Sequence, residues 1–464
     1  MAACVIFGFS SEQTAQAAAD SPSKSTAGKT NRPNVLFIAI DDLNDWIEDL
    51  GGYPGVKTPN LNRLARRGVL FTHSYCSAPA CNPSRASLMT GIRPSTSGVY
   101  HNGQPWRPAM PNAVTLTQHF MANGYRVAGG GKIFHMSLNE PESFHYYHPY
   151  QPSPVPEVRP LNGITTGGQQ FDWGPIDVPD EAMGDWKLAQ WGCNYLRQKH
   201  NQSFFLAVGF IKPHLPWYVP RKYFDLYPLS KIRLPAVKED DLDDIPEIGQ
   251  KIANPQRDHK AVLETNNWEK AVQAYLATIS FVDACLGKLL DALDQSPYAN
   301  NTIVILWSDH GWHLGEKLHW RKFALWEEAT RMPFMIVAPG LAKPNSRCQR
   351  TVSLLDIYPT MIELCGLPLK KNLEGKSLVP LLKHPNAPWD RPVVTTHGRN
   401  NHAVRSERWR YIRYQDGSEE LYDHKNDPME WTNLADKSRF ASIKKKLAKW
   451  LPETNAPDAP HQTR

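Results

Sequence analysis

The sequence predicts an α/β protein: a large domain built on a mostly parallel mixed sheet flanked by helices, and a small C-terminal α+β subdomain with an antiparallel sheet. Continuous apolar runs without polar alternation recur along the chain, which is typical of strands buried on both faces of a parallel sheet. These runs alternate with helical patterns, the arrangement expected of an α/β fold. With 464 residues, 41% of them hydrophobic, the chain can bury a core of that size.

Ionisable side chains follow three of the predicted strands at the point where each strand ends. The three strands are residues 34–40, 203–210 and 302–307. The residues that follow them are Asp41 and Asp42, Lys212 and His214, and Asp309 and His310. Because the binding crevice of an open α/β sheet lies beyond the carboxyl ends of its strands, we expect these residues to converge on one site.

The remaining elements follow from the same patterns. Helices are predicted at 60–67 and 267–293, and a proline-rich surface loop at 141–179. Beyond Pro388 the chain predicts short antiparallel strands at 393–396, 402–405, 409–414 and 420–422, then a helix at 439–450. The predicted organisation is a signal or flexible leader over 1–31, a large domain over 32–388 and a C-terminal subdomain over 389–464.

The N-terminus and the overall charge narrow the function classes. A short apolar run at 2–9 and the alanines at 17–19 resemble an export signal and its cleavage site, although no positive segment precedes the run. We predict export to the periplasm or the cell exterior. The alternative is a disordered tail that carries no targeting signal. No later stretch has the roughly 20 uninterrupted apolar residues of a membrane span. A net charge of +6 without an extended basic block disfavours nucleic-acid binding.

Seven cysteines, scattered without paired spacing, predict neither a disulfide framework nor a zinc module, so most are expected to be buried. Cys81 differs from the others. Asn82 as N-cap and Pro83 in the first turn predict a helix over 84–90. Cys81 would then lie at a helix N-terminus beside Arg85, where an anion is favoured, so its thiol is expected to be acidified and reactive. The plainer alternative is a buried structural cysteine.

The segment around Cys81 carries a family signature. Residues 81–85 (CNPSR), followed by 88–91 (LMTG), resemble the C-x-P-S-R…L-T-G signature of type I sulfatases, with Met89 where leucine is usual. The resemblance extends from residue 32 to the segment ELYDHKNDPMEWTNLA, and it implies an alkaline phosphatase-like fold. It is closest to the iduronate-2-sulfatase branch in three stretches: 131–135 (GKIFH), 212–216 (KPHLP) and 308–312 (SDHGW). Many sulfatases have Asp-Asn where this chain has Asp-His.

The resemblance implies a modified cysteine and a calcium site. In this family a formylglycine-generating enzyme oxidises the signature cysteine to Cα-formylglycine, whose hydrated aldehyde is the nucleophile. The family pattern assigns the Ca²⁺ ligands to Asp41, Asp42, Cys81 in its modified form, Asp309 and His310. Carboxylates suit so hard a cation, whereas His310 is an unusual ligand that the family pattern alone supplies. Asp309 would also accept the proton of the attacking hydroxyl.

The resemblance also gives the other site residues their roles. Arg85 and Lys132 would hold the aldehyde hydrate and the sulfate oxygens, and Lys322 would lie with His214 at the leaving oxygen. His214 would be the general acid, since imidazole titrates near neutral pH. His135 would be the base for the step in which the second hydroxyl expels sulfate. This covalent route replaces one difficult displacement by two easier steps.

The expected substrate is a sulfated polysaccharide or oligosaccharide, attacked at a chain end. His101, Trp106, Arg107 and Trp312 are predicted to contact it, because they lie close in sequence to site residues. Trp217 shares that property. Aromatic faces and a basic group would suit a sugar ring that bears a carboxylate or a second sulfate. With 15 tryptophans in the chain, structural roles for these rings are the alternative.

Three other functions remain to be weighed. A phosphodiesterase or phosphonate hydrolase of the same superfamily would use a similar site, but a phosphate dianion favours two metals and further Asp/His ligands are not evident. A non-catalytic glycan-binding relative should lack the nucleophile or a ligand, whereas every expected position is occupied. A thiol enzyme without formylglycine should not need the proline and arginine that follow Cys81. The sequence therefore favours a sulfuric ester hydrolase.

Overall fold

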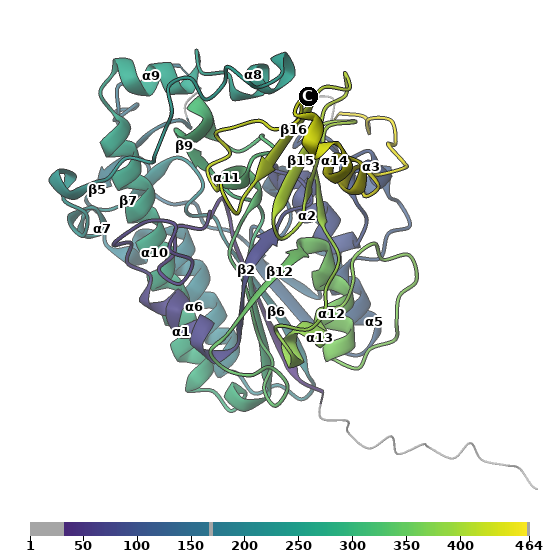
Figure 1. Ribbon diagram of the computed structural model, residues 1–464. Coiled ribbons are helices and arrows are strands. Elements are labelled where there is room, and N and C mark those ends of the chain that lie inside the picture. The colour runs from purple at the N-terminus through teal and green to yellow at the C-terminus, as the bar shows by residue number, and fades with distance from the viewer. Residues whose placement is uncertain (1–31, 167–169, 462–464) are drawn as a thin grey trace, which may run out of the picture. The chain divides into compact units, whose positions relative to one another are not determined.

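An eight-stranded sheet forms the centre of the structure, a computed structural model that describes residues 32–166 and 170–461 (Figure 1). Its strand order is β12-β2-β11-β8-β1-β6-β3-β4. The strands are β1 (Asn34–Ile40), β2 (Val69–Tyr75), β3 (Arg126–Gly131), β4 (Tyr146–His148), β6 (Phe204–Phe210), β8 (Thr302–Ser308), β11 (Phe334–Val337) and β12 (Ser346–Ser353). β11 runs antiparallel to β2 and β8, and the other pairings in this sheet are parallel. The predicted mostly parallel mixed sheet is confirmed.

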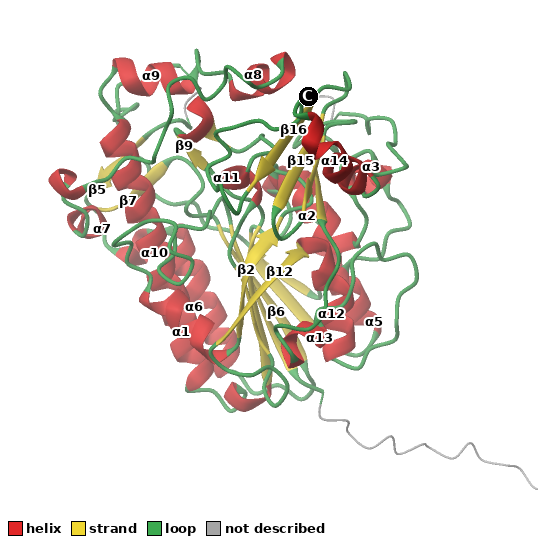
Figure 2. Ribbon diagram, in the orientation of Figure 1, coloured by secondary structure: helices red, strands yellow, loops and turns green. Residues whose placement is uncertain are grey.

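Helices cover both faces of this sheet (Figure 2). One face carries α1 (Pro59–Arg67), α6 (Gly184–Arg197) and α10 (Trp268–Asp294), and the other carries α2 (Cys81–Thr90), α5 (Leu116–Ala122), α12 (Ile357–Leu364) and α13 (Val379–Lys383). The even-numbered residues of β1, from Leu36 to Ile40, pack into the first core, and the odd-numbered residues, from Val35 to Ala39, pack into the second. Because successive side chains of a strand point to opposite faces, a strand covered on both sides needs a continuous apolar run.

Shorter elements connect these layers. The helices are α3 (Pro94–Ser97), α4 (Trp106–Ala109), α7 (Arg221–Asp225), α8 (Glu247–Ala253), α9 (Asp258–Glu264) and α11 (Glu327–Thr330). Two small sheets pair β5 (Trp173–Ile176) with β7 (Trp217–Pro220), and β9 (His313–Leu314) with β10 (Trp320–Arg321). The prediction of a plain surface loop over 141–179 is wrong in part, because β4 joins the edge of the main sheet and β5 pairs with β7. Strands this short show too little alternation to be recognised among prolines.

The predicted C-terminal antiparallel sheet is present. Its strands are β13 (Val393–Thr396), β14 (His402–Arg405), β15 (Trp409–Arg413) and β16 (Glu419–Asp423), and α14 (Ala441–Ala448) follows them. The helix is shorter than predicted because a 3₁₀ turn at Ser438–Phe440 precedes it. From residue 33 onward the chain forms one compact unit, and the boundary at 388/389 stays a prediction.

A buried ionic network joins the C-terminal sheet to α11. Arg410 of β15 is fully buried and pairs with Glu327 of α11 and with Glu430, whose Oε1 lies 2.5 Å from its Nε. Arg405 of β14 also binds Glu327 (3.0 Å), and His424 lies 2.8 Å from Glu430. Burial alone would raise the pKa of both glutamates, but these cations outweigh it and bring the pKa of Glu430 to about 2. The carboxylates are therefore held charged and paired.

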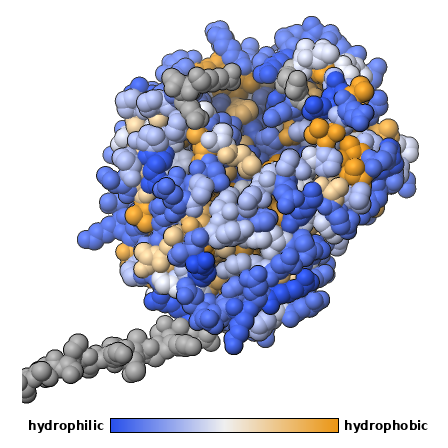
Figure 3. All heavy atoms as spheres, turned by 180° about the vertical axis from the view of Figure 1, so that it is seen from behind, coloured by the Kyte–Doolittle hydropathy of each residue, from blue (hydrophilic) through white to orange (hydrophobic). Residues whose placement is uncertain are grey.

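The described helices, cysteines and surface bear on membrane insertion, disulfide bonding and the polarity of the surface. Within residues 32–166 and 170–461, the helices are too short or too polar to cross a membrane. The predicted export signal lies outside the described residues. Six cysteines are described, all are buried, and each carries a free thiol. Figure 3 shows a mostly hydrophilic face on which hydrophobic side chains are scattered in small groups.

Arg410→Met is expected to destabilise the protein by about 3–5 kcal/mol, because it removes one partner from a buried ion-pair network and leaves two glutamates without it. Urea unfolding followed by circular dichroism measures this loss. The matched control is Arg408→Met, just before β15, whose guanidinium is half-exposed where it pairs with Asp423, so its loss should cost less. Equal unfolding midpoints for the two variants would contradict the importance of the network.

Candidate active site

The carboxyl ends of two central strands bring the predicted metal ligands to one place. Asp41 and Asp42 follow β1, and Asp309 and His310 follow β8, which is hydrogen-bonded to β1. Cys81, the first residue of α2, completes the group. One ligand atom from each of these five residues lies within 4.8 Å of the others, and all five residues are buried. The convergence predicted from the strand ends is thus present for these two strands.

Arg85 holds this cluster together. It lies on α2, about one turn after Cys81, without exposed surface, and its Nη2 and Nε bind Asp41 (3.0 Å) and Asp309 (2.8 Å). Its Nη1 donates to the backbone carbonyls of Lys132 and Ile133. A buried charge is tolerated only when it is paired and hydrogen-bonded, and the planar guanidinium offers enough donors to meet that condition. Arg85 therefore fixes α2 to the ends of β1 and β8 and to the segment after β3.

Two lysines flank the sulfur of Cys81. The Nζ of Lys322 lies 3.0 Å from Sγ and 2.6 Å from Oδ1 of Asp42. The Nζ of Lys132 lies 3.6 Å from Sγ and donates to Asp41. Burial alone would lower the pKa of both lysines, but the carboxylates outweigh it and raise the pKa of each. Two charged ammonium groups therefore face position 81, where they favour an anion.

Asp42 shows that the cluster fits a divalent cation. Its buried Oδ2 has no hydrogen-bond partner. Burial and the neighbouring carboxylates raise the pKa of Asp42 by more than Lys322 lowers it. Its backbone adopts a left-handed conformation (φ 60°), and its N–H donates to Asp309 (3.1 Å). A hard cation would satisfy the free oxygen and offset the repulsion among the carboxylates, which are the ligands that Ca²⁺ prefers.

The structure corrects two predictions about Cys81. Helix α2 begins at Cys81 and not at Ser84. Asn82 is not its N-cap, since the side-chain amide donates to the carbonyls of His101 (3.0 Å) and Gln104 (2.7 Å). The thiol is not acidified either, because burial raises the pKa of Cys81 to about 12 in spite of the two lysines. Position 81 is 1% exposed, a property that its local sequence does not reveal.

The two predicted catalytic histidines lie at the rim of the cluster. The Nε2 of His214 faces Oδ2 of Asp42 at 3.9 Å, and its Nδ1 lies 2.5 Å from the Leu215 carbonyl oxygen, to which it donates. His135 follows β3 and is half-buried. Burial and the nearby lysines lower the pKa of His135 to about 4 and hold the pKa of His214 well below its usual value. Both rings are therefore neutral near pH 7.

The tryptophans predicted to contact substrate are enclosed. Trp106 is 2% exposed and stacks on Phe134, with 5.2 Å between ring centroids. Trp312 is equally buried and packs against Trp217 at 6.0 Å. Neither ring presents an open face, so stacking on a sugar does not fit their positions. Trp312 instead lies under the ammonium of Lys322, 5.4 Å from its ring centroid.

The other two predicted substrate contacts are nearer the surface. His101 is partly exposed, and its Nε2 lies 3.6 Å from Asp458. Its backbone carbonyl accepts the hydrogen bond from Asn82, which places it beside the start of α2. Arg107 pairs with Glu140 at 2.9 Å, so its charge is matched within the protein. His101 therefore fits a substrate contact better than Arg107.

Two serines that the sequence did not single out also shape the site. The hydroxyl of Ser84 donates to the backbone carbonyl of Asp309 (2.6 Å) and so ties α2 to the end of β8. The hydroxyl of Ser308 donates to the carbonyl of His310 (3.0 Å) and accepts from the N–H of Leu43 (3.0 Å). Ser84 belongs to the family signature and Ser308 ends an apolar strand, and those positions are the signals that point to them.

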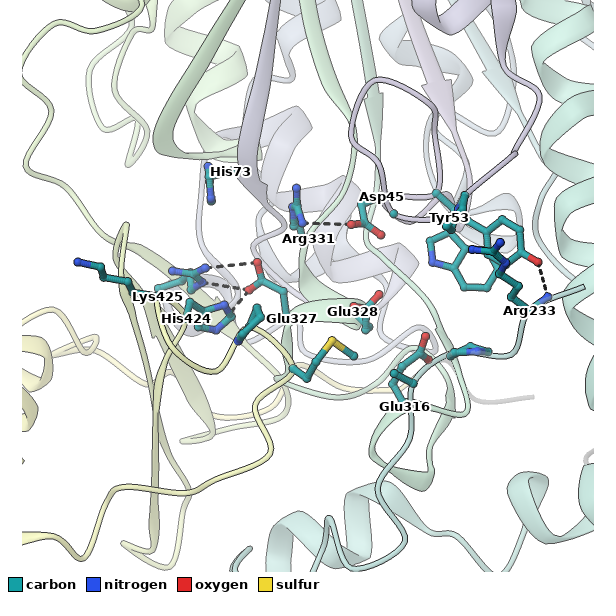
Figure 4. A pocket seen from close by; sticks show the side chains of 18 of the residues that line it. Asp45, Tyr53, His73, Arg233, Glu316, Glu327, Glu328, Arg331, His424 and Lys425 are labelled. Carbon is teal, nitrogen blue, oxygen red and sulfur yellow. Dashed lines mark hydrogen bonds and ion pairs between the residues drawn. The ribbon is translucent and has the colours of Figure 1, made fainter.

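A separate cavity of about 700 Å³ does not contain the cluster. Its lining includes Asp45, Glu316, Glu327, Glu328 and Arg331 (Figure 4). Arg331 pairs with Asp45 at 3.1 Å across it. Glu327, His424 and Glu430 also lie close enough together to hold an ion. The buried arginines of the network already neutralise these glutamates, so this second group fits a cation less well.

Sequence comparison places the chain in a family. The sequence model of the sulfatase family matches residues 33–367, and that of the C-terminal region of N-sulphoglucosamine sulphohydrolase matches residues 315–456. A sulfatase of Formosa agariphila is 42% identical over 93% of this chain and 89% of its own length. Iduronate 2-sulfatase of Homo sapiens is 31% identical over 73% of this chain and 70% of its own length. The chain therefore belongs to the sulfatase family and is a type I sulfatase, as its signature predicted.

Solved structures confirm the alkaline phosphatase-like fold. The phosphonate monoester hydrolase of Agrobacterium radiobacter is 23% identical, with a TM-score of 0.74 over 90% of this chain and 94% of that chain. A protein solved with its substrate D-glucosamine-2-N,6-O-disulfate is 21% identical, with a TM-score of 0.71 over 90% of this chain and 96% of that chain. At these identities the likeness shows the fold alone.

Calcium is expected to raise the Tm of the metal-free protein, because it would bind the folded cluster and not the unfolded chain. At a hundredfold excess over Kd, the stabilisation should be about 2.7 kcal/mol. Differential scanning fluorimetry with and without Ca²⁺ measures it. Asp42→Asn should abolish the response, whereas Asp45→Asn, a nearby buried carboxylate outside the cluster, should retain it. A shift of equal size in Asp42→Asn would place the ion elsewhere.

Proposed function

We propose that this sulfatase removes sulfate from a sulfated carbohydrate, an oligosaccharide or polysaccharide attacked at a chain end, with Ca²⁺ and a formylglycine at position 81. The observation that carries the proposal is the arrangement of the four other predicted ligands and two lysines around the buried side chain of Cys81. The carbohydrate substrate is supported by relatives: besides iduronate 2-sulfatase, an ulvan-active sulfatase of Formosa agariphila is 27% identical over 90% of this chain.

The charges of the site suit an anionic ester once a cation is bound. The residues that would hold the ion are Asp41, Asp42, residue 81, Asp309 and His310. Bound Ca²⁺ would supply positive charge for a sulfate oxygen and lower the pKa of a hydroxyl at position 81. Arg85, Lys132 and Lys322 already balance the three carboxylates. The added cation leaves a net positive site, which the negative charge of a sulfate ester offsets.

Position 81 suits a modified side chain better than a thiol. Only a thiolate is a good nucleophile, and the pKa of about 12 keeps Cys81 protonated at neutral pH. A formylglycine-generating enzyme would convert it to an aldehyde, whose hydrate offers a hydroxyl for attack at sulfur. Asp309 accepts the proton of that hydroxyl. The Nζ atoms of Lys132 and Lys322 lie 3.6 and 3.0 Å from the present Sγ. These distances support a role for Lys132 in holding the hydrate and the sulfate oxygens, and a role for Lys322, with His214, near the leaving oxygen.

His214 is the group placed to protonate the leaving oxygen. Its Nδ1 is engaged with Leu215, so the acid must carry its second proton on Nε2, the atom that faces the cluster. The free site disfavours that imidazolium, since burial and the lysines lower the pKa of His214. The negative charge of a bound sulfate ester acts in the opposite sense and raises this pKa. Protonation of His214 is therefore coupled to substrate binding.

His135 is suited to the second step. Its pKa of about 4, lowered by burial and then by Lys132, leaves its ring neutral and able to accept a proton at pH 7. It takes the proton of the second hydroxyl as sulfate leaves, which returns position 81 to the aldehyde. The ring nitrogen not used by Ser137, whose hydroxyl lies 3.0 Å from Nδ1, is the one available for this transfer.

A phosphonate or phosphate ester hydrolase is the second candidate function. Two phosphonate monoester hydrolases share the fold with TM-scores of 0.74 and 0.76. A phosphate dianion favours two metals, however. Within the described residues, one other group could hold an ion: Glu327, His424 and Glu430. It lies outside the cluster around Cys81, and arginines neutralise its glutamates. The single cluster therefore disfavours a phosphate dianion, whereas a phosphonate monoester carries one negative charge, as a sulfate ester does, and is distinguished by assay.

The proposal includes export to the periplasm or the cell exterior, where sulfated polysaccharides are met. Its support is the apolar run at residues 2–9 and the alanines at 17–19. Export would place conversion of Cys81 before or during transfer of the chain.

The converted protein is expected to release sulfate from one class in a panel of sulfated glycosaminoglycan, ulvan, carrageenan and fucan oligosaccharides. Cys81→Ala should lower the rate by at least about 10³-fold, because it removes the nucleophile. The protein is co-expressed with a formylglycine-generating enzyme, conversion is checked by mass spectrometry, and sulfate is measured by ion chromatography with Ca²⁺ present.

Cys76→Ala is the matched control, since Cys76 is an equally buried thiol five positions away that lies outside the cluster. It should keep the wild-type rate. Converted protein that releases no sulfate from the panel but cleaves phosphonate or phosphate esters would contradict the proposed function.

A further inference from the structure

Lys212 is a buried charge that the chemistry above does not use. It follows β6 two residues before His214 and is 6% exposed. Its ammonium donates to the backbone carbonyls of His214 (3.3 Å) and Pro216. Burial lowers the pKa of Lys212 to about 8, although Asp185 acts in the opposite sense. A buried ammonium is tolerated where its donors are satisfied, and here the acceptors belong to the segment that carries the proposed general acid.

The segment around Lys212 is anchored at both ends. The carboxylate of Asp185 accepts the N–H groups of Ile211 (2.9 Å) and Lys212 (2.8 Å). At the other end, the indole of Trp217 donates to the carbonyl of Pro213 (2.6 Å). Between these anchors the chain must turn so that the His214 ring reaches the cluster. On the inside of that turn, the carbonyl of His214 accepts from Lys212. The carbonyl of Pro216 accepts both from Lys212 and from the backbone N–H of Tyr218 (3.1 Å).

The position of the ammonium bears directly on the His214 ring. Nδ1 of His214 binds the carbonyl of Leu215, and Lys212 binds the carbonyls immediately before and after it, those of His214 and Pro216. Because peptide units are planar, fixing these two carbonyls restricts the orientation of the one between them. The direction in which the Leu215 carbonyl points sets where Nδ1 can bond, and hence where Nε2 points.

We propose that Lys212 is a positioning residue for the general acid, holding the His214 ring with Nε2 toward the leaving oxygen by way of the two carbonyls. The inference rests on the proposed function. In the step it serves, the hydroxyl oxygen of residue 81 would form a bond to sulfur and give its proton to Asp309, while the S–O bond to the leaving group breaks. The electron pair of that bond would go to the leaving oxygen, which would take the proton from Nε2 of His214. Lys212 contacts none of the reacting atoms and acts only through His214. Its effect on the rate should therefore be larger for more basic leaving groups, which depend more on protonation.

The test compares leaving groups of different basicity. Substituted phenyl sulfates, from 4-nitrophenyl to 4-methoxyphenyl sulfate, are assayed with converted, Ca²⁺-loaded wild type and Lys212→Met, and log kcat is plotted against the pKa of the leaving phenol. General acids contribute about 10²–10⁴-fold to rates. Lys212→Met should lie within about threefold of wild type for 4-nitrophenyl sulfate but fall by about tenfold or more for 4-methoxyphenyl sulfate. Its plot should therefore be steeper.

Matched variants separate positioning from general loss of structure. Lys317→Met removes another buried ammonium, bound to Asp241 (2.8 Å) and to the carbonyl of Glu430, and should lower Tm without changing the slope. His214→Ala should give the steep slope, and adding Lys212→Met to it should not steepen it further, because both act through one group. Lys212→Gln keeps N–H donors on a shorter side chain and should give an intermediate slope. It provides the test if Lys212→Met does not fold.

The outcomes distinguish the inference from the function on which it rests. Equal loss for all phenyl sulfates in both Lys212 variants, with the wild-type slope, would overturn the inference and leave Lys212 a structural role. Converted wild type that hydrolyses neither these esters nor any sulfated oligosaccharide would overturn the proposed function, and the inference with it.

Discussion

Arg85 lies without exposed surface between Asp41 and Asp309, at 3.0 and 2.8 Å, and the geometry of the site depends on this contact. The two aspartates follow β1 and β8, and Arg85 lies about one turn into α2, so one guanidinium fixes two strand ends to the N-terminal half of a helix. Removing any one partner would leave an uncompensated charge in the interior, which is strongly unfavourable. Position 81 is placed by the same contact, four residues before Arg85 on that helix.

The balance of charge explains how so many ionisable groups can be buried together. Three cationic side chains face three carboxylates, yet the Oδ2 of Asp42 has no partner and its pKa is raised. A divalent cation would satisfy that oxygen and leave an excess of positive charge where the substrate binds. The two lysines beside Cys81 direct this charge to the place where a sulfate group would sit. Affinity for an anionic ester would then follow from the packing of the strand ends.

The sequence predicted three strands of the main sheet (β1, β6 and β8), the ionisable residues that follow them and the C-terminal sheet, because apolar runs and motif order are local properties. Burial depends on long-range packing, which local patterns do not contain. Cys81 and Trp106 therefore suggested a reactive thiol and a platform for a sugar, whereas the folded chain leaves them 1% and 2% exposed. The three-residue β4 was missed because so short a strand has no recognisable period. The sequence marked Lys212 only as an ionisable residue after a strand. Its contacts could not be foreseen, since its acceptors are backbone oxygens, which every sequence supplies.

The proposed mechanism requires a cation and a modified residue 81 to meet at the ends of β1 and β8. A crystal structure of the converted protein, grown with Ca²⁺ and inorganic sulfate and measured with anomalous scattering, would show whether they do. We expect an anomalous peak ligated by Asp41, Asp42, Asp309 and His310, with a hydrated formylglycine at position 81 and a sulfate between Lys132 and Lys322. A peak at Glu327, His424 and Glu430 instead, or an unligated cluster at saturating calcium, would contradict it.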